Sequence, residues 1–264
     1  MNRIDTTFQQ CRKDNRKALV MFVSAGDPSL TATEALIPAI AAAGADIIEI
    51  GVPFSDPMAD GTTIQEASQR ALTAGTTLPG IIEMVRRVRH QTDAALVLFS
   101  YYNVVLQYGV EALARDSAEA GIDGWLLVDV PAEEADEVKP ALDENDLRLV
   151  TLVAPTTAAD RARDLIAKAS GFVYYITVTG VTGARQALPA RLAEDLAQLR
   201  AGQSIPIVAG FGISSGAMAR EIGAHADGVV VGSALIQKMN AAPTVDQGIR
   251  DAETFVRELA AALR

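Results

Sequence analysis

Short apolar runs alternate with longer amphipathic segments along the whole chain, and this alternation constrains the fold more than any other feature. Eight such runs occur, at residues 18–24, 46–51, 95–101, 124–129, 147–153, 172–177, 205–210 and 228–232. Each is rich in Val, Ile and Leu and is bounded by Gly, Pro, Asp or Ser. Both faces of each run are apolar, as in the strands of a parallel sheet that is covered on both sides. Parallel strands need crossover connections, which the amphipathic segments supply.

Eight strand–helix units predict an α/β protein with a closed (β/α)8 TIM barrel. The chain has 264 residues, which is close to the usual length of such a barrel, so residues 1–264 are expected to form one domain. A doubly wound sheet is the alternative, although it usually has fewer strands. A helix over residues 2–15 is expected to close the bottom of the barrel. A short extra helix from Ser233 to about Met239, and a longer one from about Thr244, are expected after the eighth strand.

The composition argues against several kinds of catalytic site. The chain has two histidines, His90 and His225, and one cysteine, Cys11. A histidine-based triad, a His/Cys zinc site and a disulfide framework are therefore nearly excluded, and carboxylates or backbone groups must do most of the chemistry. No lysine ends a predicted strand, which argues against a Schiff-base mechanism. No metal is expected, but magnesium held by carboxylates stays open.

Charge and hydropathy indicate a soluble protein of the cytoplasm. The first residues lack the apolar core of a signal peptide, and a single cysteine suits a reducing compartment. The most apolar stretch, residues 36–52, is interrupted by Pro38, Gly44, Asp46 and Glu49 and cannot span a bilayer. With a net charge of -10, the chain has no general attraction to nucleic acid or to a membrane.

Two glycine-containing loops predict a phosphate site. TIM-barrel enzymes often bind phosphate with the loops after strands 7 and 8 and with the N-terminus of a short extra helix. Residues 210–215 (GFGISS) follow the seventh run, and Gly232 and Ser233 follow the eighth. Backbone N–H groups there can approach an anion closely, although tight turns alone would also explain the glycines. The loop 178–185, after the sixth run, is expected to close over a substrate or to be an ordinary connection.

Two carboxylates near the second run are candidate acid–base residues. Glu49 lies in the apolar sequence IIEI, where an unpaired carboxylate is costly. Burial raises the pKa of a carboxyl group toward neutrality, which suits a general acid or base. Asp60 lies in the loop just beyond and is expected to face the same pocket. A structural carboxylate pair is the alternative. Asp129, at the end of the fourth run, is either a further candidate or a helix cap.

Apolar and aromatic side chains are expected around the same rim, where they would line a pocket for a flat aromatic ligand. They are Phe22, Tyr101, Tyr102, Leu127, Tyr174 and Phe211. Core packing is the alternative for each of them. Trp125, inside the fourth run, is assigned to packing.

Several motifs, in matching order and spacing, resemble those of the alpha subunit of tryptophan synthase along essentially the whole chain. They are 47–53 (IIEIGVP), 53–61 (PFSDPMADG), 180–183 (GVTG), 210–214 (GFGIS) and 228–233 (GVVVGS). The resemblance implies a lyase of tryptophan biosynthesis. Such an enzyme cleaves a carbon–carbon bond of indole-3-glycerol phosphate by a retro-aldol reaction, giving indole and D-glyceraldehyde 3-phosphate.

The resemblance also implies roles for individual residues. Glu49 would protonate indole C3 and help to deprotonate the glycerol hydroxyl, while Asp60 would hold the indole N–H. The implied substrate-binding residues are Phe22, Ser100, Tyr102, Leu127, Tyr174, Thr182, Gly183, Phe211, Gly212, Gly232 and Ser233. Four of them, Gly183, Gly212, Gly232 and Ser233, would meet the phosphate. Thr182 would contact Asp60 when the loop closes.

The family's usual partner is a β subunit that uses pyridoxal phosphate. The resemblance therefore implies an α2β2 heterotetramer and no cofactor in this chain, with the loop 53–60 at the interface and Asp56 as a contact. Thr62 and Val104 stand where the family commonly has proline, which predicts a looser loop. A lyase active without a partner, a phosphosugar isomerase and a non-catalytic activating subunit are the alternatives.

Overall fold

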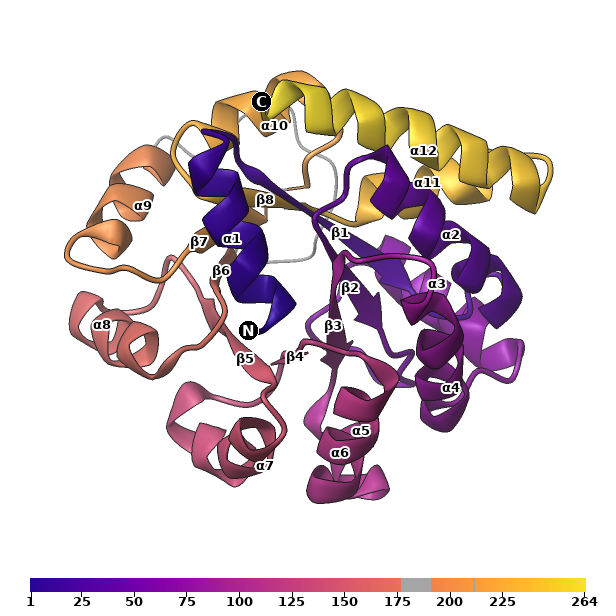
Figure 1. Ribbon diagram of the computed structural model, residues 1–264, viewed down its shortest axis with the longest axis horizontal. Helices are drawn as coiled ribbons and strands as arrows, with labels where there is room; N and C mark the ends of the chain where they lie inside the picture. The colour runs from indigo at the N-terminus through magenta and orange to yellow at the C-terminus, as the bar shows by residue number, and fades with distance from the viewer. Residues whose placement is uncertain (177–190, 211) are drawn as a thin grey trace.

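The computed structural model describes residues 1–176, 191–210 and 212–264, and in these ranges eight parallel strands form a closed barrel (Figure 1). The strands are β1 Ala18–Ser24, β2 Ile47–Gly51, β3 Ala95–Ser100, β4 Gly124–Leu127, β5 Arg148–Val153, β6 Val173–Ile176, β7 Ile207–Gly210 and β8 Gly228–Val231. Each strand pairs with the next, and β8 pairs with β1. The predicted TIM barrel is confirmed, and the doubly wound sheet is excluded.

Helices of the described ranges surround the barrel, except for the first, which lies across one end of it (Figure 1). They are α1 Arg3–Lys13, α2 Leu30–Ala43, α3 Thr62–Thr73, α4 Leu78–Arg89, α5 Tyr102–Tyr108, α6 Val110–Ala120, the 3-10 helix η1 Ala132–Glu137, α7 Lys139–Glu144, α8 Ala159–Lys168, α9 Leu192–Arg200, α10 Gly216–Gly223, α11 Ser233–Ala241 and α12 Val245–Ala262. None of these helices is long and apolar enough to cross a membrane.

Side chains alternate along each strand between two apolar layers. On β1, Leu19 and Met21 point outward and join the layer between strands and helices. Val20, between them, joins a separate cluster inside the barrel. Since both layers are apolar, the strands read as continuous apolar runs in the sequence.

Predicted strand boundaries lie within one or two residues of the observed ones wherever the structure describes them. The largest difference that bears on the site is at β4, which ends at Leu127, because Val128 and Asp129 form a turn. The extra helix α11 begins at Ser233, and α12 begins at Val245, both within one residue of the predicted starts. The Thr244 side chain caps α12.

The helix α1 closes the bottom of the barrel, as its position in the sequence predicts. Ile4, Phe8 and Cys11 are buried against the interior cluster of the strands. The ring of Phe8 lies 5.7 Å from that of Phe172, between centroids. One end of the barrel is therefore filled with apolar side chains, which leaves the opposite end for a site.

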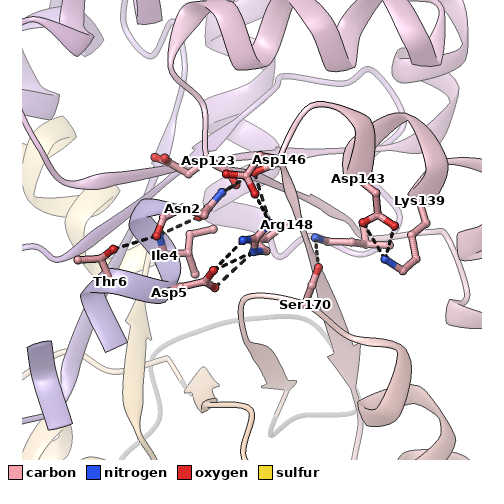
Figure 2. Close-up of polar contacts among 11 residues, drawn as sticks. Asn2, Ile4, Asp5, Thr6, Asp123, Lys139, Asp143, Asp146, Arg148 and Ser170 are labelled. Carbon is pink, nitrogen blue, oxygen red and sulfur yellow. Dashed lines mark hydrogen bonds and ion pairs between the residues drawn. The ribbon is translucent and has the colours of Figure 1, made fainter. Parts of the chain in front are cut away.

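Polar contacts fix α1 to the loops that precede β4 and β5 (Figure 2). The Asn2 side chain caps α1 and donates to the carbonyls of Asp123 and Asp146, at 2.8 and 2.7 Å. Arg148, the first residue of β5, pairs with Asp5 of α1 at 2.7 Å and with Asp146 at 2.8 Å. The contacts made by Asn2 and Asp5 join residues more than a hundred positions apart in the chain, so α1 is held by tertiary interactions.

Candidate active site

A cavity of about 150 Å³ opens at the carboxyl ends of the strands, away from α1. Glu49 and Asp60 both line it. An apolar wall is formed by Phe22, Phe99, Val128, Leu152, Tyr174 and Ile176. Gly210, Gly212, Gly232 and Ser233 line it as well, from the loops at the ends of β7 and β8. The cavity thus combines two carboxylates, an apolar wall and glycine-rich backbone, in the part of the barrel where TIM-barrel enzymes carry their sites.

Glu49 is a buried carboxyl group at the centre of β2. It lies in register with Phe22 of β1 and Val97 of β3, and its residue is 1% exposed. Its Oε1 atom has no hydrogen-bond partner among the residues that the structure describes. Burial raises the pKa of Glu49 to about 8, because an ionised carboxylate is poorly solvated there. At neutral pH this carboxyl group therefore holds its proton, and it can act as an acid.

Asp60 is held at the cavity by the loop that follows β2. The Tyr101 hydroxyl donates to its Oδ2 atom at 3.1 Å and accepts the N–H of Ala59 at 3.0 Å. The Gln65 side chain donates to the Asp60 carbonyl at 2.9 Å. The ring of Phe54 stacks on that of Tyr101, with centroids 4.9 Å apart. Tyr101, at the end of β3, thereby fixes both the carboxylate and the backbone of this loop.

The environment of Asp60 leaves it more acidic than Glu49. Burial raises the pKa of Asp60 to about 6, and the hydrogen bond from Tyr101 opposes this rise. At pH 7 Asp60 is therefore mostly ionised while Glu49 is mostly protonated. Two carboxyl groups with different protonation states in one pocket are the usual arrangement of an acid and an electrostatic stabiliser.

Backbone geometry at the ends of β7 and β8 suits an anion. Gly212 has a φ of 56°, in the left-handed region that glycine adopts without strain. Gly232 immediately precedes α11, and Ser233 is the first residue of that helix. The first N–H groups of a helix have no partner within it and carry a partial positive charge, so this end of the cavity can bind a phosphate.

Of the predicted site residues, Phe22, Glu49, Asp60, Tyr174, Gly212, Gly232 and Ser233 line the cavity together. Thr182, Gly183 and Phe211 lie outside the described residues, as does the loop 178–185.

Three predicted binding residues lie elsewhere. Leu127 points outward into the layer beneath the helices, because alternation on β4 places Leu126 and Val128 inside. Tyr102 belongs to α5, and its hydroxyl donates to the Glu137 carboxylate. Ser100 is buried, and its hydroxyl donates to a backbone carbonyl.

The apolar residues that sequence reasoning missed carry a usable signal. Phe99, Val128 and Leu152 line the cavity and were not predicted to do so. Glu49 is in register with Val97, so Phe99, two residues on, points to the same side of β3. Val128 and Leu152 follow by the same alternation from Leu126 and Val150. The inward direction of Glu49, carried from strand to strand through the register of β2 to β5, would have identified these residues.

Two other sequence candidates have structural roles. The Asp129 carboxylate accepts the N–H of Tyr102 at 2.8 Å, at the N-terminus of α5, so it caps that helix. Trp125 is fully buried, and its indole N–H donates to Ser117 at 3.1 Å, as expected for a packing residue. In the part of the chain that the structure describes, no group of three His, Cys, Asp or Glu residues is placed to hold a metal ion.

Known proteins resemble this chain over its full length. A family model described as "Tryptophan synthase alpha chain" matches residues 8–264. The tryptophan synthase alpha chain of Geobacter sulfurreducens is 51% identical over 263 residues, covering 100% of this chain and 99% of the relative. That of Xylella fastidiosa is 47% identical over 266 residues, covering 100% and 98%.

Solved structures agree with the sequence relatives. A Mycobacterium tuberculosis tryptophan synthase structure superposes with a TM-score of 0.92 at 36% identity, covering 100% of this chain and 98% of the other. The tryptophan synthase alpha chain of Legionella pneumophila gives 0.91 at 34% identity, covering 100% and 97%.

Proposed function

This chain belongs to the tryptophan synthase alpha chain family, and on that premise we propose that Glu49 and Asp60 are its catalytic residues. The family cleaves indole-3-glycerol phosphate in tryptophan biosynthesis, so the chain is a carbon–carbon lyase. The observation that carries the assignment is the joint presence of the two carboxyl groups in one cavity, with one buried and unpaired within the described structure and the other hydrogen-bonded to Tyr101.

Cleavage requires a proton at carbon C3 of the indole ring. The protonated carboxyl group of Glu49 provides that proton, and the carboxylate that remains accepts the proton of the glycerol hydroxyl. The bond between C3 and the glycerol carbon then breaks, and the electron pair of this bond returns to the indole ring. The carbon that carried the hydroxyl becomes the aldehyde carbon of glyceraldehyde 3-phosphate. Glu49 ends the cycle with a proton again, so the reaction consumes no co-reactant.

Positive charge develops on the indole nitrogen while C3 is protonated. The ionised Asp60 accepts the hydrogen bond of this N–H group and stabilises the charge, and Tyr101 keeps the carboxylate in place. Phosphate bound at Gly212, Gly232 and Ser233 would supply binding energy far from the reacting bond and so orient it. Phe22 and Tyr174 would flank the indole ring from the apolar wall.

An indole-release assay tests the proposal directly. The purified chain, alone and mixed with a tryptophan synthase β subunit, is given indole-3-glycerol phosphate, and indole is measured over time. Release is expected in both cases, and Asp60→Asn is expected to reduce it strongly while the fold is retained. Absence of release in both mixtures, or unchanged kinetics in the variant, would contradict the assignment.

A β subunit is the proposed partner, in an α2β2 assembly. The loop between β2 and α3 presents Asp56 and a 92% exposed Met58 to solvent beside the cavity, which suits a contact with another chain. Proton transfer and charge stabilisation need no cofactor in this chain, so we place pyridoxal phosphate in the partner. Co-elution with a β subunit during size-exclusion chromatography, weakened by Met58→Asp, tests the interface.

We also propose a cytoplasmic location and a single cooperative domain over residues 1–264. The substrate and one of the two products, glyceraldehyde 3-phosphate, are small phosphorylated metabolites, which supports the location. One unfolding transition, with the same midpoint by fluorescence and circular dichroism, is the expected result for one domain.

A further inference from the structure

A second cavity adjoins the reaction cavity behind its apolar wall. It has a volume of about 300 Å³ and lies near the carboxyl ends of β4 and β5. Val128, Leu152 and Ile176 line both cavities. Outward-facing Leu127 belongs only to the second. The two spaces are therefore neighbours that share part of one wall.

At this shared wall, β4 and β5 are no longer paired by backbone hydrogen bonds. The β4–β5 ladder stops at the pair Leu126 and Val150, whereas β5 stays paired with β6 as far as Val153. At Val128 and Leu152 the two strands are thus no longer joined by the ladder. Both side chains pack against the interior cluster and are half-buried. Side chains, rather than hydrogen-bonded backbone, separate the cavities here.

We propose that Leu152, with Val128 beside it, sets the upper size limit on the indole ring of the substrate. Removing this side chain joins the two cavities, so that the protein accepts indoles carrying an apolar substituent on the benzo ring. The second cavity suits such a group, because Ala135, Leu149 and Leu165 contribute apolar surface to it. This inference rests on the proposed function, which places the indole ring against the apolar wall.

The reverse reaction gives the simplest test. Indole and glyceraldehyde 3-phosphate combine when C3 of indole bonds to the aldehyde carbon, the aldehyde oxygen takes up a proton, and C3 loses one. No atom leaves and no oxidant is needed. The 4-, 5-, 6- and 7-methylindoles and the corresponding chloroindoles serve as probes, and kcat/KM for each is divided by the value for indole.

Leu152→Ala is expected to raise this ratio about tenfold or more for at least one ring position, as one methyl group in a tight pocket discriminates by roughly that factor. Ile64→Ala is the matched control, since Ile64 lines the reaction cavity but not the second one. It removes a similar volume without joining the cavities. An equal gain in both variants would mean that mere enlargement is sufficient, and would overturn the proposal.

A second variant blocks the space itself. Ala154 lines only the second cavity, so Ala154→Leu alone is expected to leave the rate with indole unchanged. In the Leu152→Ala background it is expected to abolish the gain with the larger indoles. Retention of that gain, or no gain in Leu152→Ala while thermal unfolding shows an intact fold, contradicts the proposal. Failure of the wild-type chain to condense unsubstituted indole would instead count against the proposed function.

Discussion

Replacing Glu49 with glutamine is expected to stabilise the protein while it abolishes turnover. The substitution keeps the shape of the side chain but removes the titrating proton. The folded state raises the pKa of Glu49 from its usual 4.5 to about 8, so between these values the folded chain keeps a proton that the unfolded chain releases. Wild-type stability must therefore fall as the pH rises through this window, at up to ~1.4 kcal/mol per pH unit.

The size of the effect follows from these values. At pH 5 the titration of Glu49 has lowered the free energy of unfolding of the wild type by only about 1 kcal/mol, and at pH 8 by about 4 kcal/mol. The free energy of unfolding of Glu49→Gln minus that of the wild type is thus expected to increase by about 3 kcal/mol between pH 5 and pH 8. All other titrating groups are the same in the two proteins, so their contributions cancel when the two free energies of unfolding are subtracted.

Urea unfolding at the two pH values, followed by fluorescence, measures this difference, and an indole-release assay measures turnover on the same samples. Glu144→Gln is the control, because Glu144 is exposed on α7 and its replacement is expected to give no comparable change. A stability difference that is the same at pH 5 and pH 8 would refute the reasoning that burial keeps Glu49 protonated. Turnover near the wild-type rate would refute its role as the acid.

Three further substitutions have defined outcomes. Tyr101→Phe removes the hydrogen bond that lowers the pKa of Asp60. The acidic limb of the pH profile of kcat/KM, which reflects Asp60 at about pH 6, is therefore expected to move to higher pH. A limb that stays in place argues against this coupling. Gly210→Ala places a Cβ atom 2.3 Å from the Tyr174 hydroxyl, so turnover is expected to fall by more than about tenfold. Adding Tyr174→Leu is expected to restore part of the activity. Wild-type kinetics in the single variant would show that the Tyr174 ring moves freely. Thr62→Pro fills the first position of α3, where proline is tolerated, and should raise the free energy of unfolding by ~0.4–1 kcal/mol in urea titrations; destabilisation would mean that the position does not accept a proline ring.

The chemistry of the site was more readable from the sequence than its walls. Glu49 is conspicuous because a carboxylate interrupts an apolar strand, and that signal is local. Leu127 was predicted to face the substrate, but one residue of strand register decides between the cavity and the outer layer, and both are apolar. When a strand is apolar on both faces, its sequence does not indicate which face points into the barrel. Only pairing to a strand of known direction, such as β2 with Glu49, resolves it.

Loop contacts were the least predictable part of the site. The hydroxyl of Tyr101 donates to Asp60, which lies 41 positions away in the sequence, and the spacing of the two residues does not predict this contact. Tyr102, the next residue, was the predicted neighbour of the substrate and instead bonds to Glu137. Strand ends turn into helices at this point, so a shift of one residue changes a side chain from lining the cavity to lying on the surface.

The contacts that hold α1 also set an order of assembly during synthesis. Asn2 binds the backbone of Asp146, so α1 has no final place until the chain as far as β5 exists. At ~5–20 residues per second the ribosome needs on the order of 7–30 s to add the intervening segment. Throughout that time the apolar face of Ile4 and Phe8 has no barrel to cover. A helix that is made first thus waits for β5 before it reaches its final place, and its apolar face stays exposed on the nascent chain until then.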